Sequence, residues 1–471
     1  MKQKQFTFFV IIALLFSVNY SFSQSDDVYY WNNTELVSSS DCLSNKSNFD
    51  DLKLAKTSTE TITNFKIYVE VNFKNKVFDD LKSFNDFDLE FWLLSHRAFK
   101  AGASLKITIA YTINSEEKEQ FYNFCLKHIE SIVRGEKETS KKTEYVKHSV
   151  YFATDRNKVK TKNLNDAFGN KRADLQYGIC EVSIPLNHDL GKIESPSIWK
   201  FEFSEDPSKH IMIRDIDMLE KDKFFKSLSR NIKKSKTKST FLFVHGYNTS
   251  FSEAAKRTAQ ISHDLLFEGK PVFYSWPSQA SMFKYPKDEA NIEWARYNIK
   301  NFLEDYISKS EAEDIYLVAH SMGNRGLTKA IVELMTEKPH LRKNIKEIIL
   351  AAPDIDADVF RNDIAPKMAS KIQKPITLYV SSDDLALKAS KALHGNPRAG
   401  DSGSGLVIVK GVETIDASGV DTSFLSHSYF ADTNSIISDI FDIIKSGKRA
   451  LNRERLKLMK FSDDIYWRVK Q

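Results

Sequence analysis

Short apolar segments alternate with stretches of helical periodicity from residue 148 onward. One such stretch repeats apolar residues at spacings of three and four, namely Ile292, Ala295, Ile299, Phe302 and Tyr306. The apolar segments have the length of buried strands and cover residues 241–244, 272–275, 315–319, 345–352, 376–380 and 406–409. This alternation predicts an α/β domain over residues 148–445, with a mostly parallel central sheet and helices on both of its faces.

The region before this domain has a different pattern. Residues 24–60 are rich in Ser, Asn and Asp and predict a loose lead-in. Apolar and polar residues alternate over 66–73, which predicts a strand, and residues 104–112 predict a second one.

A helix is predicted next. Asn114 is placed to cap it, Glu117 occupies the capping-box position, and the apolar spacing continues to about Val133. The charged stretch 134–147 predicts a linker. Residues 24–147 are therefore expected to form a small α+β unit followed by a charged linker.

The N-terminus has the pattern of a secretory signal peptide. Two lysines precede an apolar run at 6–18, and Ser21 and Ser23 have the spacing of a signal peptidase site. The alternative is an N-terminal membrane anchor, but the run is short for a spanning helix of about 20 residues. We expect residues 1–23 to be removed and the mature protein to be exported, periplasmic or extracellular, with no transmembrane segment.

The charge balance gives little support to nucleic acid as a partner. Lys and Arg number 68 against 63 Asp and Glu, which gives a net charge of +5. This bias is too small to indicate nucleic-acid binding. The basic C-terminal tail, residues 446–471, has its Lys and Arg on a helical pattern and predicts a solvated closing helix, with contact to an anionic surface as the alternative.

Metal and cofactor sites are not predicted. The three cysteines, Cys42, Cys125 and Cys180, cannot all pair with one another, and their spacing matches no metal site. The alternating acids at 354–358 suggest a calcium loop, but that interpretation fails because Val359 and Ala365 occupy the positions that need Gly and Glu.

The strongest chemical signal surrounds Ser321. An apolar strand runs into His320-Ser321-Met322-Gly323, and a helical pattern follows. Small residues, Ala319 and Gly323, lie two positions before and after the serine, as a sharp nucleophile elbow requires. The helix after the turn would favour developing negative charge at its N-terminus. A chance match to small-x-Ser-x-Gly is common, but the flanking strand and helix favour the elbow.

A second signal precedes it by two strand–helix units. The strand at 241–244 ends in His245-Gly246-Tyr247, and Gly246 allows the backbone to turn close to a substrate. The backbone N–H groups of Tyr247 and Met322 are the predicted oxyanion donors. His245 is expected to be structural.

A serine nucleophile needs a base, which in this topology follows the acid along the chain. His427 lies after the last predicted strand and is the favoured base. His394, in a Gly/Pro-rich loop, is the lesser candidate, and His340 falls in a helix–strand connection on the wrong side of the sheet.

Two places supply candidate acids. Asp383 and Asp384 follow the strand at 376–380, and either is suited to orient the imidazole. The rivals are Asp354 and Asp356 at the end of the preceding strand, which are equally suited to cap a helix or brace a loop.

Several motifs occur in order between about residue 148 and residue 445. They are Tyr151-Phe-Ala-Thr-Asp155-Arg156, Tyr177-Gly178 with Val182-Ser-Ile-Pro185, Phe243-Val-His-Gly-Tyr-Asn248, Tyr274-Ser-Trp-Pro-Ser278, Ala319-His-Ser-Met-Gly-Asn324, Ala351-Ala-Pro-Asp354, Tyr379-Val-Ser381 with Asp384-x-Ala-Leu387, and His427-x-Tyr429. Together they resemble a family of bacterial alpha/beta hydrolases of the esterase/lipase superfamily, named as domain of unknown function nine hundred. The resemblance covers nearly two thirds of the chain.

The resemblance implies the alpha/beta-hydrolase fold and a Ser–Asp–His hydrolase, and its Asp-x-Ala-Leu motif points to Asp384. We therefore expect an exported serine hydrolase that cleaves small carboxylic esters or related acyl compounds without a cofactor. The alternatives are a non-catalytic binding protein on the same scaffold and an amidase or peptidase with the same triad.

Overall fold

The computed structural model describes residues 144–195, 205–281, 284–403, 405–419 and 434–470, together with six strands nearer the N-terminus. The chain forms two compact units, Met1–Lys141 and Lys142–Gln471. The predicted signal peptide, residues 1–23, and the predicted base, His427, lie outside the described residues.

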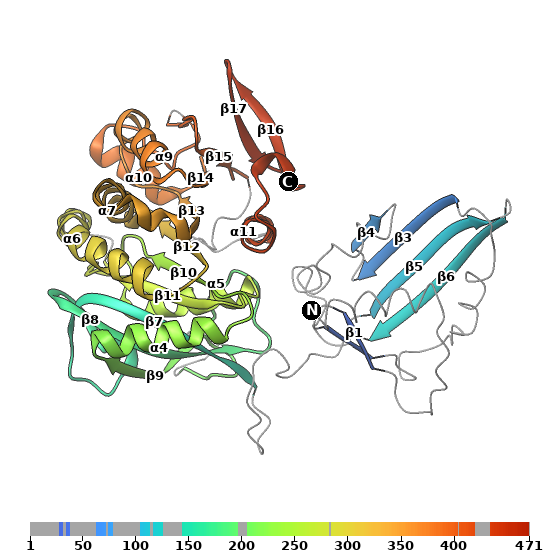
Figure 1. The fold of residues 1–471 in the computed structure, drawn as a ribbon, viewed down its shortest axis with the longest axis horizontal. Coiled ribbons are helices and arrows are strands. Elements are labelled where there is room, and N and C mark those ends of the chain that lie inside the picture. The colour runs from blue at the N-terminus through green and yellow to red at the C-terminus, as the bar shows by residue number, and fades with distance from the viewer. Residues whose placement is uncertain are drawn as a thin grey trace. The chain divides into compact units, whose positions relative to one another are not determined.

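The first unit contains a six-stranded antiparallel sheet in the order β1-β2-β6-β5-β3-β4 (Figure 1). Its strands are β1 (Val28–Trp31), β2 (Thr34–Val37), β3 (Thr63–Val71), β4 (Lys74–Phe78), β5 (Ser104–Ile113) and β6 (Glu116–Cys125). The strands predicted at 66–73 and 104–112 correspond to β3 and β5.

The helix predicted from Asn114 to Val133 is wrong. Residues 116–125 form β6, which pairs with β5 along its whole length, from Ile113 opposite Glu116 to Ser104 opposite Cys125. The apolar spacing fits either structure, but the segment also carries aromatic residues, which favour strands when a neighbouring strand is present. The pairing partner decides between the two.

The second unit is built on an eleven-stranded sheet in the order β16-β17-β15-β14-β13-β12-β10-β11-β7-β8-β9. Its strands are β7 (Tyr145–Lys158), β8 (Phe168–Pro185), β9 (Met212–Leu219), β10 (Ser239–Val244), β11 (Lys270–Ser275), β12 (Asp314–His320), β13 (Ile345–Ala351), β14 (Ile376–Val380), β15 (Glu413–Asp416), β16 (Leu456–Phe461) and β17 (Asp464–Val469). The strands from β7 to β17 in this order pair in parallel, and the two ends of the sheet are antiparallel. The predicted mostly parallel sheet is confirmed.

Helices cover both faces of this sheet (Figure 1). The longer ones are α4 (Lys221–Lys234), α5 (Phe251–Asp264), α6 (Tyr285–Lys309), α7 (Gly323–Glu337), α9 (Ala365–Ile372), α10 (Leu385–His394) and α11 (Asn434–Ser446). α4, α6, α7 and α9 share one apolar cluster with the strands. α5 packs on the opposite face, where Phe251 contacts the rings of Phe152 and Phe273.

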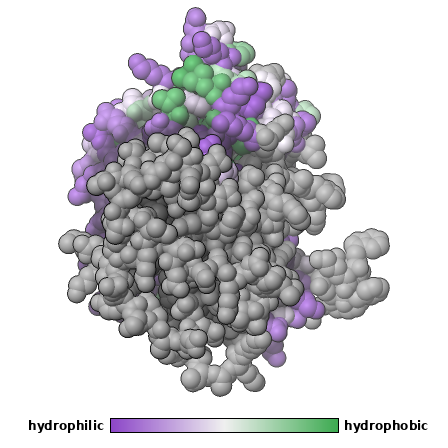
Figure 2. Space-filling view, turned by 90° about the vertical axis from the view of Figure 1, so that its right-hand side faces the viewer, coloured by the Kyte–Doolittle hydropathy of each residue, from purple (hydrophilic) through white to green (hydrophobic). Residues whose placement is uncertain are grey.

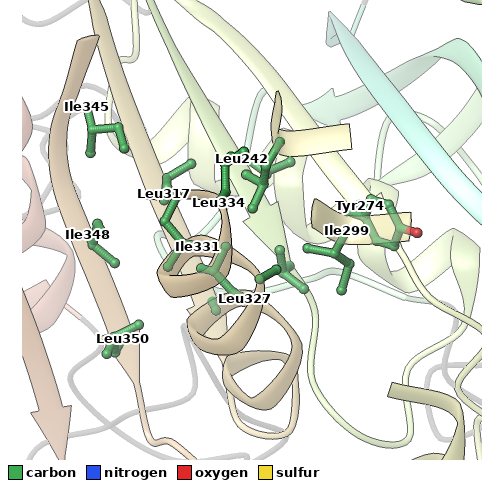
Figure 3. Packing of buried hydrophobic residues seen from close by; sticks show 14 of the residues in the cluster. Leu242, Tyr274, Ile299, Leu317, Leu327, Ile331, Leu334, Ile345, Ile348 and Leu350 are labelled. Carbon is green, nitrogen blue, oxygen red and sulfur yellow. The ribbon is translucent and has the colours of Figure 1, made fainter. Parts of the chain in front are cut away.

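The main core lies between the sheet and the helices α6 and α7. The five apolar residues predicted to form the stripe of the helix at 292–306 are all fully buried in α6. Figure 3 shows Leu327, Ile331 and Leu334 of α7 beside Leu242 and Leu317 of the central strands. Burial of these side chains fixes the position of α7, and therefore of the turn that precedes it.

The C-terminal part of the sheet differs from the prediction. Residues 406–409 form a loop, and the strand that pairs with β14 is β15, at Glu413–Asp416. The helix predicted in the tail is also wrong, since β16 and β17 form a hairpin that continues the sheet. Several basic residues of the tail form ion pairs within the fold, among them Arg453 with Asp439 and Arg468 with Asp416.

The hairpin carries exposed apolar side chains at Leu458, Phe461 and Ile465. Figure 2 shows this apolar surface at the top of the view, surrounded by hydrophilic residues. The edge strand β16 carries exposed lysines at 457 and 460, and charged side chains on an edge strand discourage its pairing with another chain. Among the described residues, no helix is both long enough and apolar enough to cross a membrane.

Candidate active site

Ser321 lies in a tight turn between β12 and α7. β12 ends at His320, α7 begins at Gly323, and Ser321 has a φ of +49°. A left-handed conformation is unfavourable for a residue with a side chain, and such strain is concentrated at functional sites. The strand–turn–helix predicted around this serine is therefore present, and its geometry is that of a nucleophile elbow.

Gly323 allows the turn to pack directly against the neighbouring strand. A Cβ at this position would lie 2.3 Å from the carbonyl oxygen of His245 and 2.7 Å from that of Val244. Both contacts are to backbone atoms, so the neighbour cannot rotate away. The start of α7 is thus pressed onto the end of β10, which brings the second predicted motif to the serine.

Gly246 contacts the elbow from the other side. A Cβ at residue 246 would lie 2.9 Å from Cβ of Ser321 and 2.8 Å from Nδ1 of His320. Tyr247 follows Gly246 directly, so its backbone lies beside the serine. Met322 is fully buried, and no described residue accepts a hydrogen bond from its backbone N–H. The structure thus brings the two predicted oxyanion donors to the same turn.

His245 supports this loop. Its ring stacks on Trp276 with centroids 5.0 Å apart, and its Nδ1 donates to the carbonyl of Gly246 at 2.8 Å. Burial, together with the nearby charge of Arg156, holds the pKa of the imidazole well below its ordinary value. A neutral, enclosed ring fits the structural role expected for His245.

Arg156 was not among the predicted site residues. It is buried at the end of β7 and donates to the carbonyl oxygens of Thr249 at 2.7 Å and Ser278 at 3.0 Å, and to Oγ of Ser275 at 2.8 Å. Burial lowers the pKa of its guanidinium to about 10, which leaves it charged at neutral pH. Arg156 therefore ties the loop after β10 to the loop after β11. The only sequence signal for it is its place in the Asp155-Arg156 motif.

The two acids after β14 have different surroundings. Asp384 is buried, and its Oδ1 accepts from the backbone N–H of Leu387 at 3.1 Å in the first turn of α10. Asp383 is exposed, and its Oδ2 accepts from the backbone N–H of Gly419 at 2.6 Å. The buried position of Asp384 is the one that suits a carboxylate directed at an enclosed imidazole.

The rival acid Asp354 belongs to a buried charged network. Its Oδ1 accepts from Oγ of Ser390 at 2.6 Å and from Nε of Arg398 at 2.8 Å. Its Oδ2 accepts from the hydroxyl of Tyr285 and lies 3.4 Å from Nη2 of Arg325. Burial opposes ionisation, but the two guanidinium groups keep the pKa of this carboxyl below its ordinary value. These partners give Asp354 the role of a brace between α6, α7 and α10.

Asp356 is a helix cap. Its Oδ1 accepts from the backbone N–H groups of Asp358 at 3.0 Å and Val359 at 3.1 Å, at the start of the short helix α8 (Ala357–Val359). This is one of the two roles that the sequence left open for it.

The two other histidines considered as the base, His394 and His340, lie at the end of α10 and in the connection after α7. His394 ends α10, where its Nδ1 donates to the carbonyl of Ser390 at 2.8 Å and its Nε2 lies 3.0 Å from Oε1 of Glu289. His340 lies in the turn Pro339–Asn344 between α7 and β13, as predicted.

Three solved structures that match part of the chain are named as hydrolases or esterases. A predicted CIB-like hydrolase from Thermoplasma acidophilum is 14% identical, covering 50% of this chain and 91% of its own, with a TM-score of 0.27. The carboxylesterase CesB from Bacillus subtilis is 10% identical over 45% of this chain and 85% of its own, with a TM-score of 0.25. An esterase from the planctomycete Thermogutta terrifontis is 10% identical, covering 46% of this chain and 84% of its own, with a TM-score of 0.25. No curated protein matches the chain.

A family model matches the part of the chain that carries the elbow. The match covers residues 220–446, from the residue before α4 to the end of α11, and the family is described as alpha/beta hydrolase of unknown function. This segment includes β10, the turn at Ser321 and the acids after β14. Residues 220–446 of this chain therefore match the model of the alpha/beta hydrolase family of unknown function, the family that the motif order along the sequence predicts.

Proposed function

We propose that this protein is a serine hydrolase that cleaves carboxylic esters or related acyl compounds through an acyl-enzyme. Ser321 is the nucleophile, His427 the base and Asp384 the acid that orients the base. The backbone N–H groups of Tyr247 and Met322 form the oxyanion hole. The fold and the family match support hydrolysis, and the geometry around Ser321 supports the roles of Ser321, Tyr247 and Met322, while the roles of His427 and Asp384 derive from the sequence motifs.

The observation that carries the proposal is the packing of Gly246 against the strained turn at Ser321. The absent Cβ lets the backbone of Gly246 pack against the serine, at the N-terminal end of α7. We assign the backbone N–H of Tyr247 in this loop as the second oxyanion donor beside that of Met322. Two such donors would stabilise the negative charge of a tetrahedral intermediate.

The reaction would proceed in two halves. Oγ of Ser321 attacks the acyl carbon while His427 takes its proton, and the carbonyl oxygen becomes the oxyanion. The intermediate collapses as His427 protonates the leaving group, which departs and leaves the acyl-enzyme. Water, deprotonated by His427, then attacks the acyl carbon, and Ser321 recovers its proton as the acid product leaves.

Asp384 is preferred to Asp354 because of what each carboxylate already binds. Asp354 is neutralised by Arg325 and Arg398, so it would add little to the stabilisation of an imidazolium. Oδ1 of Asp384 accepts from the backbone N–H of Leu387. Asp384 also follows β14, the strand next to β13 and two strands from the elbow.

A fluorophosphonate probe tests the proposal without knowledge of the substrate, because it labels only an activated serine. We expect the wild-type protein to be labelled and Ser321→Ala and His427→Ala to remain unlabelled. Ser308→Ala, at an exposed serine of α6, is the matched control and should be labelled as the wild type is. Labelling that survives in Ser321→Ala, or its absence from folded wild type, would contradict the proposal.

The acyl bond itself is tested by a panel of matched esters and amides. The same triad chemistry can cleave either bond, so the proposal of an esterase requires faster turnover of the ester in each matched pair. Faster turnover of the amides would make the protein an amidase or peptidase.

Export is a separate part of the proposal, and it derives from the pattern of residues 1–23. We expect the mature chain to begin at Gln24. The intact mass of the protein recovered outside the cytoplasm measures this directly. A chain that keeps residues 1–23, or that is found only in the cytoplasm, would contradict it.

A further inference from the structure

The carbonyl oxygen of Ser321 is held by three hydrogen bonds. It accepts from the backbone N–H of Asn324 at 3.1 Å, from the side-chain Nδ2 of Asn324 at 2.9 Å, and from the backbone N–H of Asp354 at 3.2 Å. Nδ2 of Asn324 also lies 3.1 Å from the carbonyl oxygen of Ala351, which in turn accepts from the backbone N–H of Ser321 at 2.9 Å. One buried amide group thus joins the turn to the end of β13.

This arrangement has a consequence for the next peptide group. The carbonyl of Ser321 and the N–H of Met322 belong to one planar trans peptide, so they point in opposite directions. Donors that hold the carbonyl of Ser321 toward β13 therefore direct the N–H of Met322 away from β13. A carbonyl that accepts hydrogen bonds also makes the N–H of the same peptide a stronger donor.

We propose that Asn324 is a positioning residue for the oxyanion hole: its side-chain amide sets the plane of the Ser321–Met322 peptide and so aims the N–H of Met322. The inference depends on the proposed function, because it assumes that this N–H is an oxyanion donor. Asn324 acts through that peptide and does not itself touch the substrate.

The surroundings of Oδ1 of Asn324 indicate that this side chain is needed for the donor on its other atom, Nδ2. Asn324 is fully buried, and no residue in the described part of the chain donates a hydrogen bond to its Oδ1. Turning the amide over would place Oδ1 against the carbonyl oxygens of Ser321 and Ala351, which would be repulsive, so Nδ2 must face them. A buried acceptor without a donor is unfavourable, and an apolar residue would avoid it. What an asparagine supplies here, and an apolar residue cannot, is a donor to both carbonyls.

The test compares Asn324→Ala with Thr328→Val by steady-state hydrolysis of p-nitrophenyl butyrate and by thermal unfolding. Thr328 lies one turn later in α7, is also fully buried, and loses one internal hydrogen bond to the carbonyl of Asn324 on substitution. It therefore controls for lost stability on the same helix. Asn324→Ser, which keeps a small hydroxyl donor, is the second variant in case the alanine variant does not fold.

We expect Asn324→Ala to lower kcat by about 10- to 100-fold, less than the about 10²–10³-fold cost of removing an oxyanion donor outright, with KM almost unchanged. Asn324→Ser should fall between it and the wild type, and Thr328→Val should lower the unfolding temperature without lowering kcat. If Asn324→Ala and Thr328→Val lose stability alike and both keep wild-type kcat, the inference is wrong and the proposed function stands. If folded wild type neither reacts with the fluorophosphonate nor turns over the ester, the proposed function fails and the inference fails with it.

Discussion

Gly246 and Ser321 are in direct contact although they lie on different strand–helix units. A Cβ added to Gly246 would be 2.9 Å from Cβ of Ser321 and 3.2 Å from the carbonyl oxygen of His320. Contacts this short mean that any other residue at position 246 would push the loop and the turn apart. This relationship joins the two halves of the proposed oxyanion hole, and it can be tested by substitution.

The variant Gly246→Ala should fold and lose activity. Its methyl group would push the loop of Tyr247 away from Ser321, which would misplace one oxyanion donor. We expect kcat/KM for p-nitrophenyl butyrate to fall by on the order of 10²-fold. Wild-type turnover in a folded Gly246→Ala protein would show that the loop takes no part in catalysis.

Two glycines of α7 should respond differently to alanine. At Gly323 the new methyl would meet the backbone of Val244 and His245, and at Gly326 it would meet only the side-chain tips of Ile299 and Ile292. Backbone cannot give way, so we expect Gly323→Ala to lower the free energy of unfolding by about 1–3 kcal/mol or more.

For Gly326→Ala, the about 1 kcal/mol gained in helix propensity should offset much of the repacking cost. Urea denaturation of both variants measures the difference. Equal stabilities for the two would mean that α7 can shift away from β10.

The acid assignment predicts opposite phenotypes for two asparagine substitutions. Asp384→Asn should lose up to about 10⁴-fold in the rate of probe labelling, because the imidazole loses its orienting carboxylate. Asp354→Asn should chiefly lower the free energy of unfolding, by about 3–5 kcal/mol, because it leaves Arg325 and Arg398 without their buried carboxylate.

Labelling kinetics and urea denaturation of the same protein samples separate the two effects. Asp383→Asn, at the exposed neighbour, is the control and should change neither quantity much. If a stable Asp354→Asn protein is not labelled and the Asp384→Asn protein is fully labelled, the acid of the triad is Asp354, after β13.

The ion pairs of the buried His188 make the free energy of unfolding depend on pH. His188 is buried between Asp264, at 2.8 Å from its Nε2, and Glu194, at 2.8 Å from its Nδ1. Burial lowers the pKa of His188, but the two carboxylates outweigh it and raise the pKa from 6.5 to about 10. Because the folded pKa lies above the unfolded one, this stabilisation is complete below pH 6.5 and is lost as the pH rises through 10.

We therefore expect His188→Gln to lower the free energy of unfolding by about 3–5 kcal/mol at pH 6 and by much less near pH 10. Urea denaturation at pH 6, 8 and 10 gives both curves. A difference between variant and wild type that stays constant over this range would mean that His188 is uncharged in the folded protein.

The central strands of the second unit and the helix α6 were predictable because their signals are local. The apolar stripe of α6 and the strand, turn and helix around Ser321 are each contained in a short segment. The order of the motifs was enough to indicate the alpha/beta-hydrolase family, which the family match to residues 220–446 confirms. The roles of Ser321, His427 and Asp384 remain predictions.

What only the tertiary structure decided depends on partners that are distant in the chain. Residues 116–125 form a strand because β5 offers them a full set of hydrogen bonds. Asp354 is a brace because Arg325 and Arg398 meet at its carboxylate, and Arg156 holds loops that begin at two other strands. A charge or a helical spacing in the sequence does not reveal which group will face it, because burial and pairing are created only when the chain folds.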